Sequence, residues 1–160
     1  MQEVWKVQSA KIALLTPEVL AYSAGFLDGE GHIRIQTHSR RCRTTMLSVS
    51  AVQLTELPLD WFKAHFGGTV KKRWTSYRNS KRPLWTWQVS SMQAERFLLR
   101  VLPYLQVKKA EAELALQYRA TFRPQYGDRS RMPDSVIALR KSMQEGLKQI
   151  RRDKREIAYA

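Results

Sequence analysis

Residues 16–38 read TPEVLAYSAGFLDGEGHIRIQTH, and the period of the apolar residues changes within this stretch. Thr16 followed by Pro17 is typical of a helix start, because the threonine oxygen caps free N–H groups and proline fits the first turn. Apolar residues then repeat at helical spacing, and the glycines that follow predict that the helix ends near Asp28. From residue 32 to residue 38 polar and apolar residues alternate, which predicts a strand with one buried and one wet face.

The rest of the chain continues with paired strands and helices. A second alternating strand over residues 45–53 predicts a hairpin with the first, and a second hairpin is expected over residues 69–75 and 84–90, joined by a polar loop at 76–83. Helices are expected over residues 58–66, 92–102, 107–122 and 134–155. This order predicts an α+β fold: an αββαββα core with a saddle-shaped antiparallel sheet, plus C-terminal helices.

The chain is expected to form one domain. Residues 1–15 form an N-terminal arm without an assigned role, residues 16–122 form the core, and residues 123–160 add a loop and a basic helix. Helices are expected to cover one face of the sheet, which leaves the other face polar, basic and open.

The charge of the chain is strongly one-sided. Its 160 residues contain 28 Lys and Arg against 14 Asp and Glu, a net charge of +14. Residues 31–55 and 61–94 contain no acid at all, which favours a phosphate-facing surface over an ordinary solvated one.

No apolar run approaches the length needed to span a bilayer, and the N-terminus lacks the basic-then-apolar order of a secretory signal. Cys42 is the only cysteine, so a reducing, intracellular compartment is expected.

Polar side chains on the wet strand faces are the candidates for base contacts, because Arg and Gln suit bidentate contacts with guanine and adenine in the major groove. They are Arg34, Gln36, His38, Ser48, Ser50, Lys71, Arg73, Thr75, Thr86 and Gln88, with His32 as a further DNA-contact candidate. Residues of the turns and loops are the candidates for phosphate contacts. They are Arg40, Arg41, Arg43, Tyr77, Arg78, Asn79, Lys81 and Arg82.

Small residues line one side of the first helix at a spacing of four. Ala21, Gly25 and Gly29 leave no bulky side chain there, so a second helix can approach closely. A chain with one such helix finds its partner in a second copy, which predicts a two-fold homodimer. Each copy then delivers Glu30 to the same central position, and two carboxylates side by side bind hard cations such as Mg²⁺.

Residues 23–31, SAGFLDGEG, resemble the LAGLIDADG signature of a family of homing endonucleases. The match departs at Ser23, where the family has an apolar residue, and Glu30 stands where Asp is commoner. The strand pairs, the Phe66-Gly67-Gly68 helix end and residues 102–109 also look like the family, so the resemblance covers residues 16–122.

The resemblance implies roles for individual residues. It implies a metal site at Glu30 and Gly29, occupied by Mg²⁺ or by other hard divalent ions such as Mn²⁺ or Ca²⁺. Catalytic roles are implied for Glu30, Lys108 and Gln53, although Lys109 competes with Lys108 and Thr55 with Gln53 for the matching position. The homodimer interface is expected at Ala21, Ala24, Gly25 and Asp28; Asp28 alternatively bonds backbone groups at the helix end.

The implied function is hydrolysis of phosphodiester bonds in duplex DNA at a long, near-palindromic site by an intron-encoded, homodimeric and magnesium-dependent endonuclease. Neither a membrane nor a small-molecule substrate is expected. An organelle or a prokaryotic cytoplasm is the expected compartment, and the sequence does not distinguish the two. The alternatives are an intron RNA maturase, a non-cleaving relative such as a transcription regulator, and a basic RNA-binding module. The presence of Glu30 and Lys108 favours cleavage over the non-cleaving alternatives. The sequence shows no helix-turn-helix extension, which counts against a transcription regulator.

Overall fold

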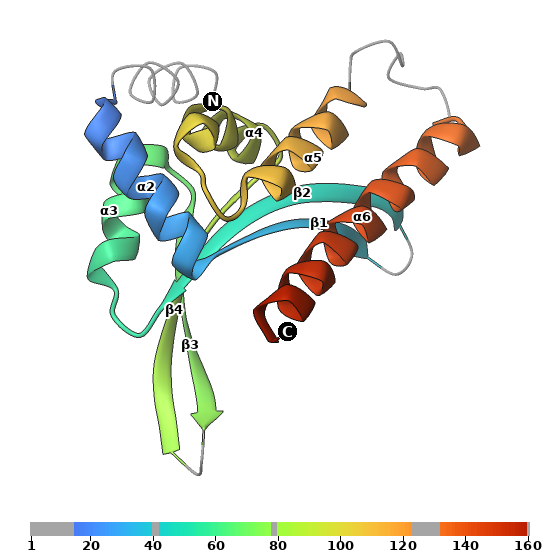
Figure 1. Ribbon diagram of the computed structural model, residues 1–160. Helices are drawn as coiled ribbons and strands as arrows, with labels where there is room; N and C mark the ends of the chain where they lie inside the picture. Colours follow the sequence, from blue (N-terminus) through green and yellow to red (C-terminus); the bar gives the residue numbers. More distant parts are fainter. Residues whose placement is uncertain (1–14, 40–41, 78–79, 123–131, 160) are drawn as a thin grey trace, which may run out of the picture.

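A computed structural model describes residues 15–39, 42–77, 80–122 and 132–159 of the chain (Figure 1). The elements follow one another as α2 (Pro17–Glu30), β1 (Gly31–Ser39), β2 (Cys42–Gln53), α3 (Leu57–Phe66), β3 (Thr69–Tyr77), β4 (Ser80–Ser90), α4 (Ser91–Val101), the 3₁₀ turn η1 (Leu102–Tyr104), α5 (Lys109–Ala120) and α6 (Asp134–Tyr159). The predicted α+β order, αββαββα followed by C-terminal helices, is confirmed, with α5 and α6 as those helices.

The four strands form one antiparallel sheet in the order β1-β2-β4-β3. The central strands β2 and β4 pair only between Ser48↔Ser90 and Gln53↔Trp85. Each hairpin continues well beyond this region, so the two hairpins diverge at their far ends (Figure 1). The helices lie on one side of the sheet, and the divergent hairpins give the other side the curvature of a saddle.

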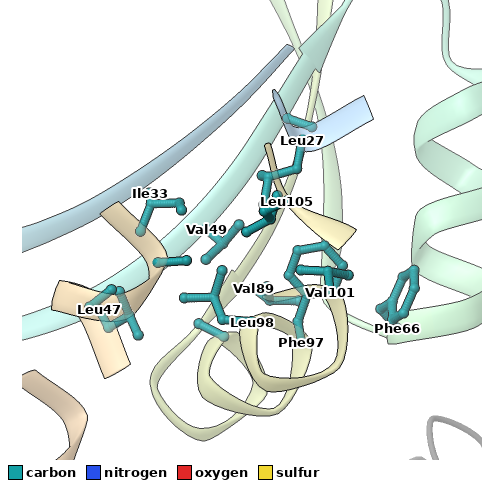
Figure 2. Close-up of a cluster of buried hydrophobic side chains, with 14 of the residues drawn as sticks. Leu27, Ile33, Leu47, Val49, Phe66, Val89, Phe97, Leu98, Val101 and Leu105 are labelled. Atoms are coloured by element: carbon teal, nitrogen blue, oxygen red, sulfur yellow. The ribbon is translucent and has the colours of Figure 1, made fainter. Parts of the chain in front are cut away.

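The core lies between the sheet and its helices. Alternate strand residues such as Ile33, Val49 and Trp87 are fully buried. Figure 2 shows Ile33 and Val49 in one apolar cluster with residues of α4. The Trp87 ring lies 5.0 Å from Phe62 of α3 and 5.2 Å from Phe97 of α4, between ring centroids. Phe66 and Phe97 meet edge to face at 4.8 Å between ring centroids. The Trp87 indole N–H donates to the Gly67 carbonyl at 2.8 Å, which satisfies its polar atom inside the core.

The helix α2 begins as expected but ends later. Thr16 accepts a hydrogen bond from the Val19 N–H, and the helix then continues through Glu30, so the expected end near Asp28 is wrong. Gly29 is therefore helical rather than a turn residue. Gly31 ends the helix, and its N–H donates to the Leu27 carbonyl. Since β1 begins at once, Glu30 lies at the junction of helix and sheet.

The second hairpin is longer than the sequence predicts. Residues 76–83 were expected to form a loop, but β3 runs to Tyr77 and β4 starts at Ser80. Apolar alternation is absent there, and this part of the hairpin projects away from the helices (Figure 1). Trp74 shows the effect, with 65% of its surface exposed.

Candidate functional site

A cavity of about 580 Å³ lies where the C-terminal end of α2 meets β1, the end of β2, the start of α5 and the helix α6. We call it the central cavity. It is lined by Gly29, Glu30, Gly31, His32, Val52, Gln53, Leu54, Leu84, Val107, Lys108, Glu111, Arg151 and Lys154. Glu30, Gln53 and Lys108 therefore face one space, although they come from three different elements. Thr55 and Lys109, the competing candidates, are exposed and do not line it.

The Asp28 carboxylate joins the end of α2 to the start of α5. It accepts the backbone N–H groups of Gln106 and Val107 at 2.8 and 3.1 Å on Oδ2, and that of Lys108 at 2.8 Å on Oδ1. The Lys108 ammonium in turn donates to the Asp28 backbone carbonyl. Asp28 thus fixes the position from which Lys108 enters the central cavity. Its carboxylate bonds the chain's own backbone, as the alternative structural role expects. Its place in a dimer interface stays a prediction.

Lys108 is half-buried, and burial lowers the pKa of its ammonium from the ordinary value of 10.5. The carboxylates of Glu111 and Asp28 oppose this shift, whereas Lys154 and Arg151 add to it. Partial burial also lowers the pKa of His32, with further contributions from the nearby cations Arg34, Arg151 and Lys108. Burial is therefore the main cause of both shifts, and the neighbouring cations of the cavity wall act in the same direction.

Three charged residues of this wall, Glu111, Arg151 and Lys154, were not predicted from the sequence. Glu111 is only 3% exposed, and its carboxylate pairs with Arg151 Nε at 3.0 Å and with Lys154 Nζ at 3.1 Å. The sequence did carry a signal, because Glu111 shares the buried side of α5 with Ala115 and Tyr118 at the spacing i, i+4, i+7. An acid on such a buried side requires a cationic partner.

Six of the strand residues that are candidates for base contacts line one depression on the open face of the sheet. A depression of about 220 Å³ crosses all four strands and is lined by Arg34, Ser50, Val52, Thr69, Lys71, Arg73, Thr86 and Gln88. Cross-strand pairing, for example His32↔Ser50 and Ser50↔Gln88, places these side chains on one face. Among the described residues, the Thr86 hydroxyl is buried and has no hydrogen-bond partner within the chain. Such an oxygen is available to a ligand or to water.

Two details of this face differ from expectation. Ser48 is only 4% exposed, since it lies in the middle of the sheet between Arg34 and Ser90, so its assignment to the wet contact surface is corrected. Val52 and Thr69 line the depression but were not predicted. The candidates Arg40, Arg41, Arg78 and Asn79 lie outside the described residues, and the side chains of His38, Arg43, Tyr77 and Lys81 are likewise not described.

The small-residue side of α2 is exposed. Ala21, Gly25 and Gly29 face outward, and a Cβ at either glycine would meet no atom within 4 Å. Ala24 is fully buried in the chain's own core, so its assignment to a partner-facing surface is corrected. Ser23 is also buried, and its hydroxyl donates to the Val19 carbonyl at 2.7 Å, which explains how a polar residue fits where the signature has an apolar one.

An apolar hollow of about 540 Å³ adjoins the exposed side of α2. It is lined by Tyr22, Leu57, Pro58 and Trp61, of which Leu57 is 81% exposed and Tyr22 53% exposed.

None of the helices in the described part of the chain has the length and apolar character that a membrane span needs. In the same part of the chain, no group of three or more His, Cys, Asp or Glu side chains could hold a metal ion.

No known protein family and no curated protein matches this sequence. Solved structures do match. The homing endonuclease I-CvuI, in complex with its target in the presence of calcium, is 25% identical with a TM-score of 0.66 over 82% of this chain and 80% of that chain. The fold is that of a homing endonuclease.

Two further structures agree with this fold. I-CvuI in complex with the I-CreI target and magnesium, in which the DNA is not cleaved, gives 26% identity, a TM-score of 0.66 and the same coverage. The archaeal intron-encoded homing endonuclease I-Vdi141I, complexed with DNA, is 16% identical with a TM-score of 0.65 over 82% of each chain. At that identity the third likeness supports the fold alone.

Proposed function

We propose that this chain is a homing endonuclease of the LAGLIDADG type, which cuts both strands of duplex DNA at a long, near-palindromic site as a homodimer with divalent metal ions. The observation that carries the proposal is the convergence of Glu30, Gln53 and Lys108 on the central cavity, at the edge of a polar and basic sheet face. DNA-bound homing endonucleases share this fold.

Duplex DNA suits the open sheet face. A curved antiparallel ribbon can enter the major groove, and Arg34, Arg73 and Gln88 carry donor and acceptor groups that match base edges. Lys71 and the basic turn residues supply positive charge for the phosphates on either side. The partnerless Thr86 hydroxyl gains a hydrogen bond when DNA or an ordered water fills the depression.

The homodimer is supported by the exposed side of α2. Ala21, Gly25 and Gly29 present a smooth surface on which a second α2 can pack closely. The apolar hollow at Tyr22, Leu57 and Trp61 offers further area beside it, since such residues are seldom clustered on a surface without a partner. A two-fold axis between the paired helices brings the two copies of Glu30 together and doubles the DNA surface.

The metal site fits the donor groups that the chain offers. Glu30 is exposed on the central cavity, and its carboxylate, together with the backbone of Gly29, supplies the hard oxygen ligands that Mg²⁺ prefers. One chain alone does not complete such a site among the residues that the structure describes, which agrees with a shared site at the dimer axis. When bound, divalent metal lowers the pKa of water and stabilises the leaving oxygen of the phosphodiester.

The chain's own residues position and stabilise the reacting groups. Lys108 holds a cationic group in the cavity, where it can stabilise negative charge that develops on the phosphate. Gln53 can orient a water molecule through its amide. Asp28 maintains the geometry by fixing the start of α5.

Cleavage of a randomised duplex library tests this proposal. The purified protein is incubated with the library in Mg²⁺ and separately in EDTA, and the cut ends are sequenced. Metal-dependent cutting at one near-palindromic site is expected. If the protein binds a duplex but does not cut it in any divalent ion, it is a non-cleaving DNA-binding protein. If it prefers structured intron RNA over every duplex, it is a maturase.

A further inference from the structure

We propose that Arg151 and Lys154, on the C-terminal helix α6, bind a DNA backbone phosphate in the central cavity, and that the buried carboxylate of Glu111 holds them in position. The inference rests on the proposed function, because the phosphate belongs to a duplex on the open sheet face. The proposal assigns the C-terminal helix α6 a direct role in binding DNA at the central cavity.

The Glu111 carboxylate is fully committed to these two cations. One oxygen accepts from Arg151 Nε at 3.0 Å and the other from Lys154 Nζ at 3.1 Å. At 3% exposure this carboxylate has almost no contact with water, and a buried carboxylate without partners is strongly destabilising. Glu111 therefore selects one position for each cation.

Each cation has a second anchor on another element. Arg151 also donates through Nη2 to the Ile33 carbonyl of β1, and Lys154 donates to the Val107 carbonyl before α5. Nearer the N-terminus of the same helix, Gln144 donates to the Ile35 carbonyl of β1 at 2.9 Å. These contacts place α6 along the edge strand β1 (Figure 1). Arg151 and Lys154, in the C-terminal part of α6, line the central cavity.

Both side chains have N–H donors that their hydrogen bonds to Glu111 and to the backbone do not use. Arg151 is 30% exposed and Lys154 35% exposed, and both line the central cavity beside Glu30 and Lys108. Guanidinium and ammonium groups carry more N–H donors than these hydrogen bonds use. The charged side chains of the cavity are three cations, Lys108, Arg151 and Lys154, against two carboxylates, Glu30 and Glu111. A phosphate is the anion that a duplex brings to this place.

A merely structural contact would not require this arrangement. Replacing a buried ion pair by apolar side chains of similar size is often neutral or stabilising, so docking of α6 alone does not explain charges at a cavity wall. The buried Leu147 already supplies apolar contact on the same helix. Charges that are both fixed and partly exposed are suited to a ligand of opposite charge.

The salt dependence of DNA binding tests the inference. The variants are Arg151→Met, Lys154→Met and the double variant Glu111→Met/Arg151→Met, which removes the anion and one cation together so that no unpaired charge is buried. Arg152→Met is the matched control, because Arg152 is exposed on the same turn of α6 and does not line the cavity. Dissociation constants for a mixed-sequence duplex are measured across a salt series without metal, after circular dichroism has established folding.

The slope of log Kd against log salt concentration should fall by about 0.9 for each phosphate that a variant no longer binds, whereas the Arg152→Met slope should match the wild type. An unchanged slope in folded variants that are merely less stable would overturn the inference and leave α6 a structural support. If the wild type binds but never cuts, the nuclease function fails while the slopes still decide this inference. If the wild type does not bind duplex DNA, both fail.

Discussion

The substitution Asp28→Ala removes the acceptor for three backbone N–H groups at the start of α5. A hydrogen bond to a charged acceptor contributes about 1.5–3 kcal/mol in mutational series. Because the bonds from Gln106 and Val107 are exposed, we take about 1 kcal/mol for each and about 1.5 kcal/mol for the part-buried bond from Lys108. The expected loss in free energy of unfolding is therefore about 3.5 kcal/mol.

Urea denaturation measures this loss. With an m-value of about 2 kcal/mol per molar, the midpoint should fall by about 1.7 M. Asp60→Ala is the matched control, because Asp60 is an exposed acid in the first turn of α3 and its removal should cost about 0.3–1 kcal/mol. The cleavage rate of Asp28→Ala should also fall under conditions where it is folded, since Lys108 loses its fixed position. If Asp28→Ala unfolds within about 0.5 kcal/mol of the wild type, the proposed link between α2 and α5 is refuted.

Three further predictions follow from single residues. Gly25→Leu should leave the isolated chain at least as stable, by up to about 1 kcal/mol, because its Cβ meets no atom and leucine favours the helix, but it should abolish dimerisation; a variant that still sediments as a dimer would remove α2 from the interface. Gly31→Ala should destabilise the chain by about 1–3 kcal/mol in thermal unfolding, since its Cβ would lie 2.2 Å from Leu27 Cδ1 and 2.6 Å from the Leu27 carbonyl oxygen, and wild-type stability would contradict this packing. The pKa of Lys108 is lower in the folded state than in the unfolded state, so the unfolded state binds more protons below pH 10.5; the free energy of unfolding of the wild type relative to Lys108→Met should therefore rise with pH toward 10.5, and a flat or falling difference would contradict the burial of this ammonium.

Local periodicity was enough to predict the element order. Helical spacing after Thr16 and alternation after Gly31 are properties of adjacent residues, and they predicted α2 and β1 directly. The wrong helix end near Asp28 shows the limit of local signals. Gly29 and Gly31 are equivalent as sequence breakers, but only Gly31 lies against Leu27, where a side chain would collide.

Sequence motifs alone were enough to predict three residues of the candidate site. Glu30, Gln53 and Lys108 were found from the signature-like stretch and its surroundings, and the structure places all three on one cavity. Ala24 was misplaced because the helical spacing of small residues does not tell which side of the helix the chain's own core covers. Glu111 and its partners on α6 are 40 and 43 residues apart in sequence, and only tertiary packing brings them together.

The role of Glu30 in a metal-dependent nuclease is tested by measuring cleavage by Glu30→Gln at the site recovered from the duplex library. The amide keeps the size of the side chain but removes the charge that holds a divalent ion. Single-turnover cleavage in Mg²⁺ and duplex affinity without metal are measured side by side with the wild type. We expect Glu30→Gln to lose cleavage by several orders of magnitude while its duplex affinity stays within a few-fold of the wild type. Cleavage at the wild-type rate by Glu30→Gln would contradict a metal-dependent nuclease centred on Glu30.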